Sequence, residues 1–159
     1  MWDHSVMDRQ ATHEDAKLIL QLYEMRREDR MREARKWFVM NFYCQTAEEA
    51  LALCPPGSEA NTSLRMVTSY WDMVASFVTS GVLHDELFFQ SGMELLLTWT
   101  RCKAAMPGIR AVFANPGYLK NLEIVGERFI EHWTRTSPGA YDAFVARMGT
   151  PPAKKAATS

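Results

Sequence analysis

Residues 69–89 read SYWDMVASFVTSGVLHDELFF, and they predict a long helix that ends at a glycine. Apolar side chains before that glycine recur every three or four residues, the spacing of one face of an α-helix. They are Val67, Tyr70, Trp71, Val74, Phe77 and Val78. Gly81 stands where a left-handed residue usually closes a helix, and Val82 follows as the apolar contact. The pattern predicts a helix over residues 61–80, capped by one of residues 61–63.

The next segment, residues 84–106, is apolar around most of its circumference. Asp85 and Glu86 would lie in its first turn, where acidic side chains complement the helix dipole. A helix that is apolar on all sides belongs in a core. We therefore expect residues 61–80 and 84–106 to form a central antiparallel hairpin. Its apolar positions after the turn are Leu87, Phe88, Phe89, Met93, Leu95, Leu96, Leu97 and Trp99.

Composition extends the helical prediction to the whole chain of 159 residues. Leu, Met and Ala together number 41, against 13 for Val and Ile. Unbranched and small apolar residues favour helix, whereas β-branched residues favour strand. We expect an all-α fold with about seven helices in one compact domain over residues 12–149. A loose N-terminal arm over residues 1–11 and a flexible tail over residues 150–159 would flank it.

Two glycines, Gly92 and Gly126, fall inside predicted helices, where each costs about 1 kcal/mol relative to alanine. The favoured interpretation is packing, because a glycine lets another helix or an aromatic ring come close. The alternative is a stretch of bare backbone that forms the wall of a ligand site.

The charge balance and the cysteines restrict the partners and the compartment. A net charge of -1 gives no general attraction for nucleic acid or acidic membranes. The longest apolar stretches, such as residues 95–97, fall far short of the roughly 20 residues that span a bilayer. Cys44, Cys54 and Cys102 are odd in number and lack CxxC spacing, which favours reduced thiols in the cytoplasm. They are interpreted as buried hydrophobes, with one reactive thiol as the alternative.

The chain contains none of the standard catalytic or cofactor motifs. It has no Glu-x-x-His for a di-iron site and no HExxH for zinc. It also lacks both glycine-rich phosphate loops and the GxSxG nucleophile motif. The sequence thus predicts no catalytic residue, no metal ligand and no cofactor, and it favours a protein that is not an enzyme.

Five polar residues within the most apolar helices are the candidate for a polar cleft. They are Asp72, Glu94, Arg101, Arg110 and Glu123. Carboxylates and guanidinium groups brought together between helices could form a site with shifted pKa values. Two other interpretations stay open: a solvent-facing stripe, or a buried ion network that only supports the fold.

Two smaller features could also carry function. Residues 26–36, RREDRMREARK, hold six basic and three acidic residues and could contact nucleic acid. The interleaved signs favour a solvated helix face instead, with pairs such as Glu28 and Arg32. His84 beside Asp85 could act as a general base, but a residue of the first helical turn is the favoured interpretation.

Four segments together resemble a bacterial family of uncharacterised all-helical proteins, a domain-of-unknown-function family. The segments are MREARKWF over residues 31–38, residues 69–89 quoted above, PGIRAVF over 107–113 and YLKNLEIVGERFI over 118–130. Members have Tyr-x-Glu before the Gly-x-Leu turn, and this chain departs from that pattern with Asp72. The resemblance implies a helical fold over about residues 13–148 and carries no catalytic residues.

These observations favour a non-enzymatic interaction module in the cytoplasm. Its 18 aromatic residues and 10 methionines could supply an adhesive surface for a second copy or another protein. The alternative is a small-molecule-binding protein or enzyme that uses a polar cleft between helices. A membrane partner is not expected, and the charge balance argues against nucleic acid.

Overall fold

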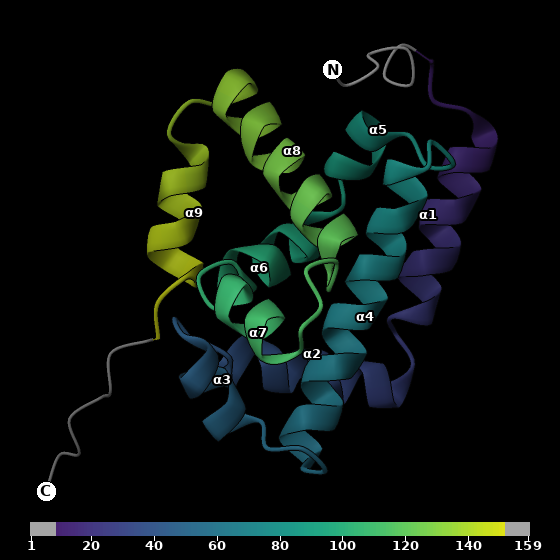
Figure 1. Cartoon of the computed structure of the whole chain (residues 1–159). Coiled ribbons are helices and arrows are strands. Elements are labelled where there is room, and N and C mark those ends of the chain that lie inside the picture. Colours follow the sequence, from purple (N-terminus) through teal and green to yellow (C-terminus); the bar gives the residue numbers. More distant parts are fainter. Residues whose placement is uncertain (1–8, 152–159) are drawn as a thin grey trace, which may run out of the picture.

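The computed structural model describes residues 9–151, and this part of the chain is all-helical (Figure 1). Nine helices and no strand lie within it. They are α1 His13–Met25, α2 Asp29–Asn41, α3 Ala47–Leu53, α4 Glu59–Thr79, α5 Asp85–Phe89, α6 Met93–Cys102, α7 Met106–Val112, α8 Lys120–Thr136 and α9 Ala140–Met148. The prediction of an all-α fold is therefore confirmed, whereas the expected number of about seven helices is not.

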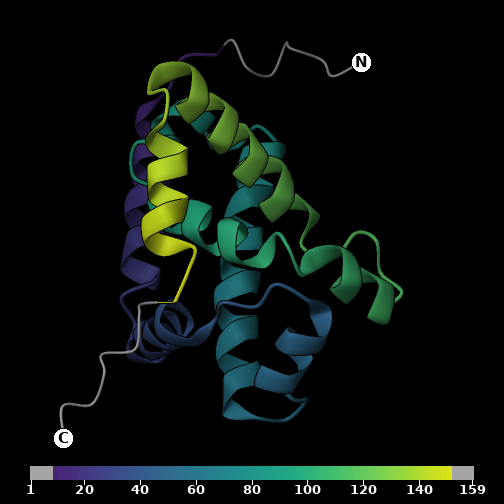
Figure 2. The same ribbon diagram turned by 90° about the vertical axis from the view of Figure 1, so that its left-hand side faces the viewer.

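Helix α4 has the most extensive contacts with other helices in the described part of the chain. Its closest neighbours are α8 and α2, which cross it at different heights in both ribbon views (Figures 1 and 2). Helix α6 packs mainly on α8. The central hairpin predicted from residues 61–80 and 84–106 is thus not confirmed, because α4 takes its main partners from elsewhere in the chain.

The predicted helix over residues 84–106 is interrupted at Gln90, Ser91 and Gly92, which separate α5 from α6. Gly92 is the N-cap of α6, and a Cβ atom there would lie 2.7 Å from the Phe88 ring. Phe88 therefore folds back onto the glycine, and the chain turns where a continuous helix was expected. The start of α4 also differs from the prediction, since Ser58 caps it by accepting from the amide of Asn61 at 3.1 Å.

Gly126 does lie within a helix, and the packing interpretation holds for it. A Cβ atom at this position would lie 2.4 Å from the Trp99 ring, well inside van der Waals contact. The glycine thus lets α8 lie directly against the indole on α6. Both helices then bury their apolar faces in a core whose largest fully buried residues include Phe38, Phe42, Phe129, Leu95, Leu96, Met106 and Leu122.

The chain ahead of α1 is held to the rest of the fold by Asp15. This carboxylate is 2% exposed and accepts from the Arg9 guanidinium at 2.6 and 2.7 Å. It also accepts from the backbone amides of Thr12 and His84, each at 2.8 Å. These contacts raise the pKa of Arg9 above its ordinary value. They also lower the pKa of Asp15 far below its ordinary value.

Most of the predicted arm and tail, residues 1–8 and 152–159, lies outside the described residues. Between residues 9 and 151, no helix combines the length and the apolar character needed to cross a membrane.

Candidate functional site

The five residues of the predicted polar cleft do not gather at one place. Asp72 on α4 accepts from the backbone amide of Leu122 at 2.9 Å. The N-cap residue of α8, Leu119, has a left-handed backbone and no side-chain cap. Asp72 thus supplies from another helix the carboxylate that the first turn of α8 lacks.

Arg110 and Glu123 are the one pair among the five that the structure brings into direct contact. The Arg110 guanidinium lies 2.7 Å from the Glu123 carboxylate and donates to the carbonyl of Tyr118 at 2.9 Å. Burial raises the pKa of Glu123, but hydrogen bonds from Lys120 and Arg110 outweigh it and leave the pKa lowered. The pair fastens α7 to the start of α8.

Glu94 and Arg101 belong to two further groups. The Glu94 carboxylate binds the Arg35 guanidinium at 2.5 and 2.6 Å and lies 3.6 Å from Arg26. Arg101, 4% exposed, donates to the carbonyls of Phe38, Val39 and Met148. Asp72 thus joins α4 to α8, the Arg110–Glu123 pair joins α7 to α8, and Glu94 and Arg101 both join α6 to α2. Within residues 9–151 they show no common cleft.

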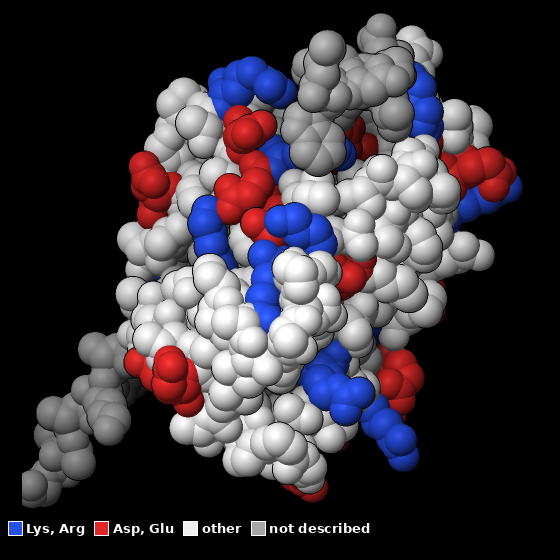
Figure 3. All heavy atoms as spheres, viewed as in Figure 1, with Lys and Arg blue, Asp and Glu red and all other residues white. Residues whose placement is uncertain are grey.

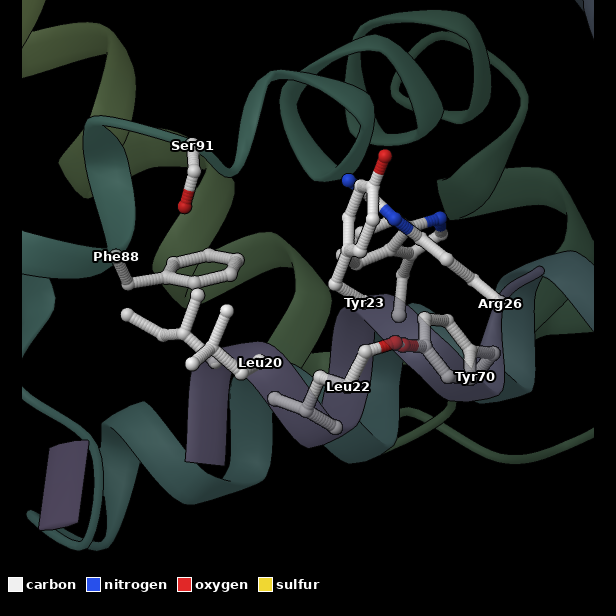
Figure 4. Close-up of a pocket in the computed structure, with 9 residues that line it drawn as sticks. Leu20, Leu22, Tyr23, Arg26, Tyr70, Phe88 and Ser91 are labelled. Carbon is white, nitrogen blue, oxygen red and sulfur yellow. The ribbon is translucent and has the colours of Figure 1, made fainter. Parts of the chain in front are cut away.

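The most promising cavity lies elsewhere, between α1, α4 and the turn after α5 (Figure 4). We call it the aromatic pocket. It encloses about 270 Å³, and its walls are almost entirely apolar. Its lining consists of Ile19, Leu20, Leu22, Tyr23, Arg26, Tyr70, Trp71, Phe88 and Ser91. Figure 4 shows Tyr23 and Arg26 side by side at one end of the pocket and Phe88 with Ser91 at the other.

Tyr70 closes the floor of the aromatic pocket. Its hydroxyl donates to the carbonyl of Leu22, which ties α4 to α1. Burial raises the pKa of Tyr70 to about 12, so the hydroxyl stays protonated at neutral pH. The Tyr70 ring meets Trp71 edge to face, with 5.0 Å between ring centres. The two neighbouring rings thus form a rigid wall.

One hydrogen-bond donor of the aromatic pocket lacks an acceptor among the described residues, and a second is held only by a long ion pair. Trp71 is 2% exposed, and its Nε1 atom is buried with no hydrogen-bond partner. The Arg26 guanidinium lies 4.9 Å from the centre of the Tyr23 ring and 5.5 Å from that of Trp71. Its side chain makes the 3.6 Å ion pair with Glu94 and no closer polar contact. A buried donor without a partner costs free energy, so this end of the pocket is suited to an acceptor.

Sequence reasoning placed these residues in other categories. Trp71 fits the apolar face of residues 61–80, and Arg26 belongs to the charged run. Whether an indole N–H finds an acceptor depends on the helix that packs over it. No signal within the sequence of α4 reveals that.

The three cysteines are buried free thiols, as the sequence favoured. Burial raises the pKa of Cys54 to about 11 and that of Cys102 to about 12. Both line a second cavity of about 200 Å³ between α3, α4, α6 and α7. The raised pKa values keep the thiols protonated, which disfavours a nucleophilic role.

The outer side of α1 carries an exposed stripe next to the aromatic pocket. It consists of Ala16, Leu20 and Tyr23, spaced four and three residues apart, and we call it the α1 stripe. Leu20 is 65% and Tyr23 48% exposed. Only Asp15 and Leu22 of α1 are buried. This helix therefore leaves much of its apolar surface uncovered.

Charged side chains of both signs alternate over the face that carries α8 (Figure 3). Three ion pairs contribute there: Lys103 with Glu127, Arg110 with Glu123, and Lys120 with Glu123. Within the charged run of residues 26–36, Arg26 and Arg35 turn toward Glu94. The face that carries α8 therefore has no continuous basic surface of the kind that binds nucleic acid.

One family model matches the chain, and its description is a domain of unknown function, DUF4760. The match covers residues 11–129, from just before α1 to within α8, and leaves α9 outside. No curated protein and no solved structure matches the chain. Because the match spans most of the sequence and agrees with the resemblance in the four quoted segments, the chain belongs to the DUF4760 family of domains of unknown function.

Proposed function

We propose that this domain is a non-enzymatic interaction module that binds a second copy of itself through the α1 stripe. The observation that carries the proposal is the 65% exposure of Leu20 in a helix that buries only two of its residues. Apolar side chains left at the surface in a group are typical of protein interaction sites. Ala16 and Tyr23 extend the group along the helix.

The spacing of the α1 stripe is that of a helix-to-helix seam. Ala16, Leu20 and Tyr23 follow the alternating intervals of four and three residues that coiled coils repeat. Side chains at these intervals lie on one side of a helix and pack between those of a facing helix. A second α1 offers the matching surface, because a two-fold dimer uses the same patch on both copies.

The charges beside the stripe favour an antiparallel arrangement. Lys17 lies three residues before Leu20 and Glu24 four residues after it, and both face the same flank. With a rise of about 1.5 Å per residue, they are about 4.5 and 6 Å from the level of Leu20. An antiparallel pair centred on Leu20 therefore places Lys17 of each copy beside Glu24 of the other. In a parallel pair the same flank of the two copies would lie on opposite sides of the seam, so Lys17 and Glu24 would not meet.

Charge reversal tests this arrangement. Lys17→Glu turns two attractive contacts per dimer into two repulsive ones, and Glu24→Lys does the same. Exposed pairs contribute about 0.2–1 kcal/mol each, so each single variant is expected to raise the dimer dissociation constant about tenfold. The double variant Lys17→Glu with Glu24→Lys restores opposite charges and should recover the wild-type constant. Sedimentation equilibrium over a range of concentrations measures all four proteins.

Two variants serve as controls for the assignment. Lys36→Glu makes the same charge change on the exposed surface of α2 and should leave the dissociation constant unchanged. Met25→Glu probes the surface of α1 beyond Glu24, where Met25 is 54% exposed beside Met73 and Phe77. A wild-type protein that stays monomeric at high concentration contradicts the proposal. So does a dimer that only Met25→Glu dissociates.

The three free thiols support a reducing compartment such as the cytoplasm as the place of action. A small-molecule-binding role is the second candidate function. The unpartnered Trp71 N–H group of the aromatic pocket favours it, rather than the five residues of the predicted cleft.

A further inference from the structure

We propose that the aromatic pocket binds a small monocarboxylate with an apolar, ring-sized body. The carboxylate would lie between Arg26 and Trp71, and the body would lie against Tyr23, Tyr70 and Phe88. The site shares Leu20 and Tyr23 with the α1 stripe, but its donors Arg26 and Trp71 lie outside the stripe.

The donors at one end of the pocket define the head group. The Trp71 Nε1 atom is buried and has no acceptor among the described residues, so a ligand reaches it only when a side chain over the ring moves. The Arg26 guanidinium lies over the same ring, 5.5 Å from its centre. Both groups only donate hydrogen bonds. A carboxylate has two acceptor oxygens, so it can accept from both groups once the Arg26 side chain rotates toward it.

The charge balance around Arg26 favours an anion. Both carboxylate oxygens of Glu94 are bound by Arg35, at 2.5 and 2.6 Å. Arg26 is left at 3.6 Å from the same carboxylate. Two guanidinium groups thus share one carboxylate, which leaves one positive charge in excess. A monoanion balances this charge, whereas a dianion such as a phosphate monoester would have to lose more hydration in an apolar pocket.

The size and lining of the pocket define the rest of the ligand. A volume of about 270 Å³ lies just below the range of about 300–1,000 Å³ that is typical of ligand sites. This volume suits a single ring with a short chain. The aromatic side chains offer both faces and edges, which favours an aromatic body over an aliphatic one.

Three probes with the same body and different head groups test the proposal. They are 3-phenylpropionate, 3-phenyl-1-propanol and 3-phenylpropylamine, each titrated into the full chain. Binding is followed by the indole N–H signals in a two-dimensional ¹⁵N NMR spectrum, with the Trp71 signal assigned by Trp71→Phe. We expect the carboxylate to shift the Trp71 signal and to bind at least about tenfold more tightly than the alcohol. The amine should bind more weakly still.

Variants identify the donors. Arg26→Gln should weaken binding of 3-phenylpropionate at least about tenfold, since a hydrogen bond to a charged group is lost. Trp71→Phe keeps a ring but removes the N–H and should weaken binding about fivefold. Arg30→Gln, an exposed arginine on α2, is the matched control and should bind as the wild type does.

Several results would overturn the site. They are an amine that binds as tightly as the carboxylate, a Trp71 signal unmoved at saturation, or wild-type affinity in Arg26→Gln or in Trp71→Phe. The NMR spectrum of each variant reports its folding. Lys17→Glu leaves the pocket lining unchanged, so the same titration on that variant separates ligand binding from self-association.

Discussion

Buried polar residues hold the helices of this protein together one contact at a time. Arg101 is the clearest example, because its guanidinium is 4% exposed and has no carboxylate partner in the described part of the chain. It donates to carbonyls near the end of α2 and at the end of α9, and it stacks 3.9 Å from the centre of the Tyr43 ring. Burial lowers the pKa of Arg101. The carbonyl acceptors replace the water that the guanidinium has lost.

The ionised form of Asp15 makes the stability of the fold depend on pH. The pKa of Asp15 lies below the ordinary value of 3.8, because Arg9 and several amides bind the ionised form. The stabilisation is therefore complete above about pH 4 and is lost as the pH falls toward the folded-state pKa. Asp15→Asn should lower the free energy of unfolding at pH 7 by about 2 kcal/mol. The variant should also lose less stability than the wild type between pH 5 and pH 2.

Urea unfolding followed by circular dichroism at several pH values measures both effects. Asp142→Asn, at an exposed position in the first turn of α9, serves as the control and should follow the wild-type curve closely. Parallel curves for Asp15→Asn and wild type below pH 5 would show that Asp15 is not the group whose protonation weakens the fold.

At the scale of the elements, the packing of α8 on α6 depends on Gly126. A Cβ atom there would lie 2.4 Å from the indole ring of Trp99. The Nε1 atom of the same ring donates a hydrogen bond to the Glu127 carboxylate at 2.9 Å. Alanine has the higher helix propensity by about 1 kcal/mol, but the collision outweighs this gain. Replacing Gly126 with alanine therefore shows whether packing or helix propensity decides the stability of this helix pair.

Gly126→Ala should destabilise the fold by about 2 kcal/mol through overpacking. In a Trp99→Leu background, which makes room for the methyl group, the same change should cost much less. A double-mutant cycle of urea unfolding measures this coupling. Equal effects of Gly126→Ala in both backgrounds would contradict the close approach.

The elements also show how far the sequence could predict the fold. The helical class follows from local pattern, because it depends on neighbouring residues, and a glycine inside an apolar helix indicates the close approach found at Gly126. The break at Gly92 was missed, since it depends on how Phe88 folds back onto the chain. The partners of α4 could not be predicted either, because helices with similar apolar faces can pair in several ways.

The candidate site was predicted less well than the fold, because it depends on which helices pack against each other. Asp72 and Arg101 were singled out as polar residues in apolar helices, and the structure places each where it satisfies backbone groups. Arg26 and Trp71 were assigned to a charged run and to a core face. Their meeting in one pocket, where the Trp71 N–H lacks an acceptor, arises only when α1 packs over α4.

At the scale of the whole molecule, α1 connects the two proposed activities. It lines one side of the aromatic pocket, and Leu20 and Tyr23 belong both to this lining and to the α1 stripe. The helix is fixed at one end by Asp15 and in the middle by the Tyr70 hydroxyl on the Leu22 carbonyl. Both surfaces are therefore presented on a defined element, as a binding module requires.

Disulfide trapping at Leu20 tests the central claim, antiparallel self-association through α1, most directly. Cys44, Cys54 and Cys102 are buried, so Leu20→Cys introduces an exposed thiol that stands apart from them. In the proposed dimer the two copies of position 20 face each other at the two-fold axis. Under a mild oxidant, a covalent dimer is expected for Leu20→Cys and much less of it for Lys36→Cys on α2. A Leu20→Cys protein that stays monomeric on a non-reducing gel at millimolar concentration would contradict the account.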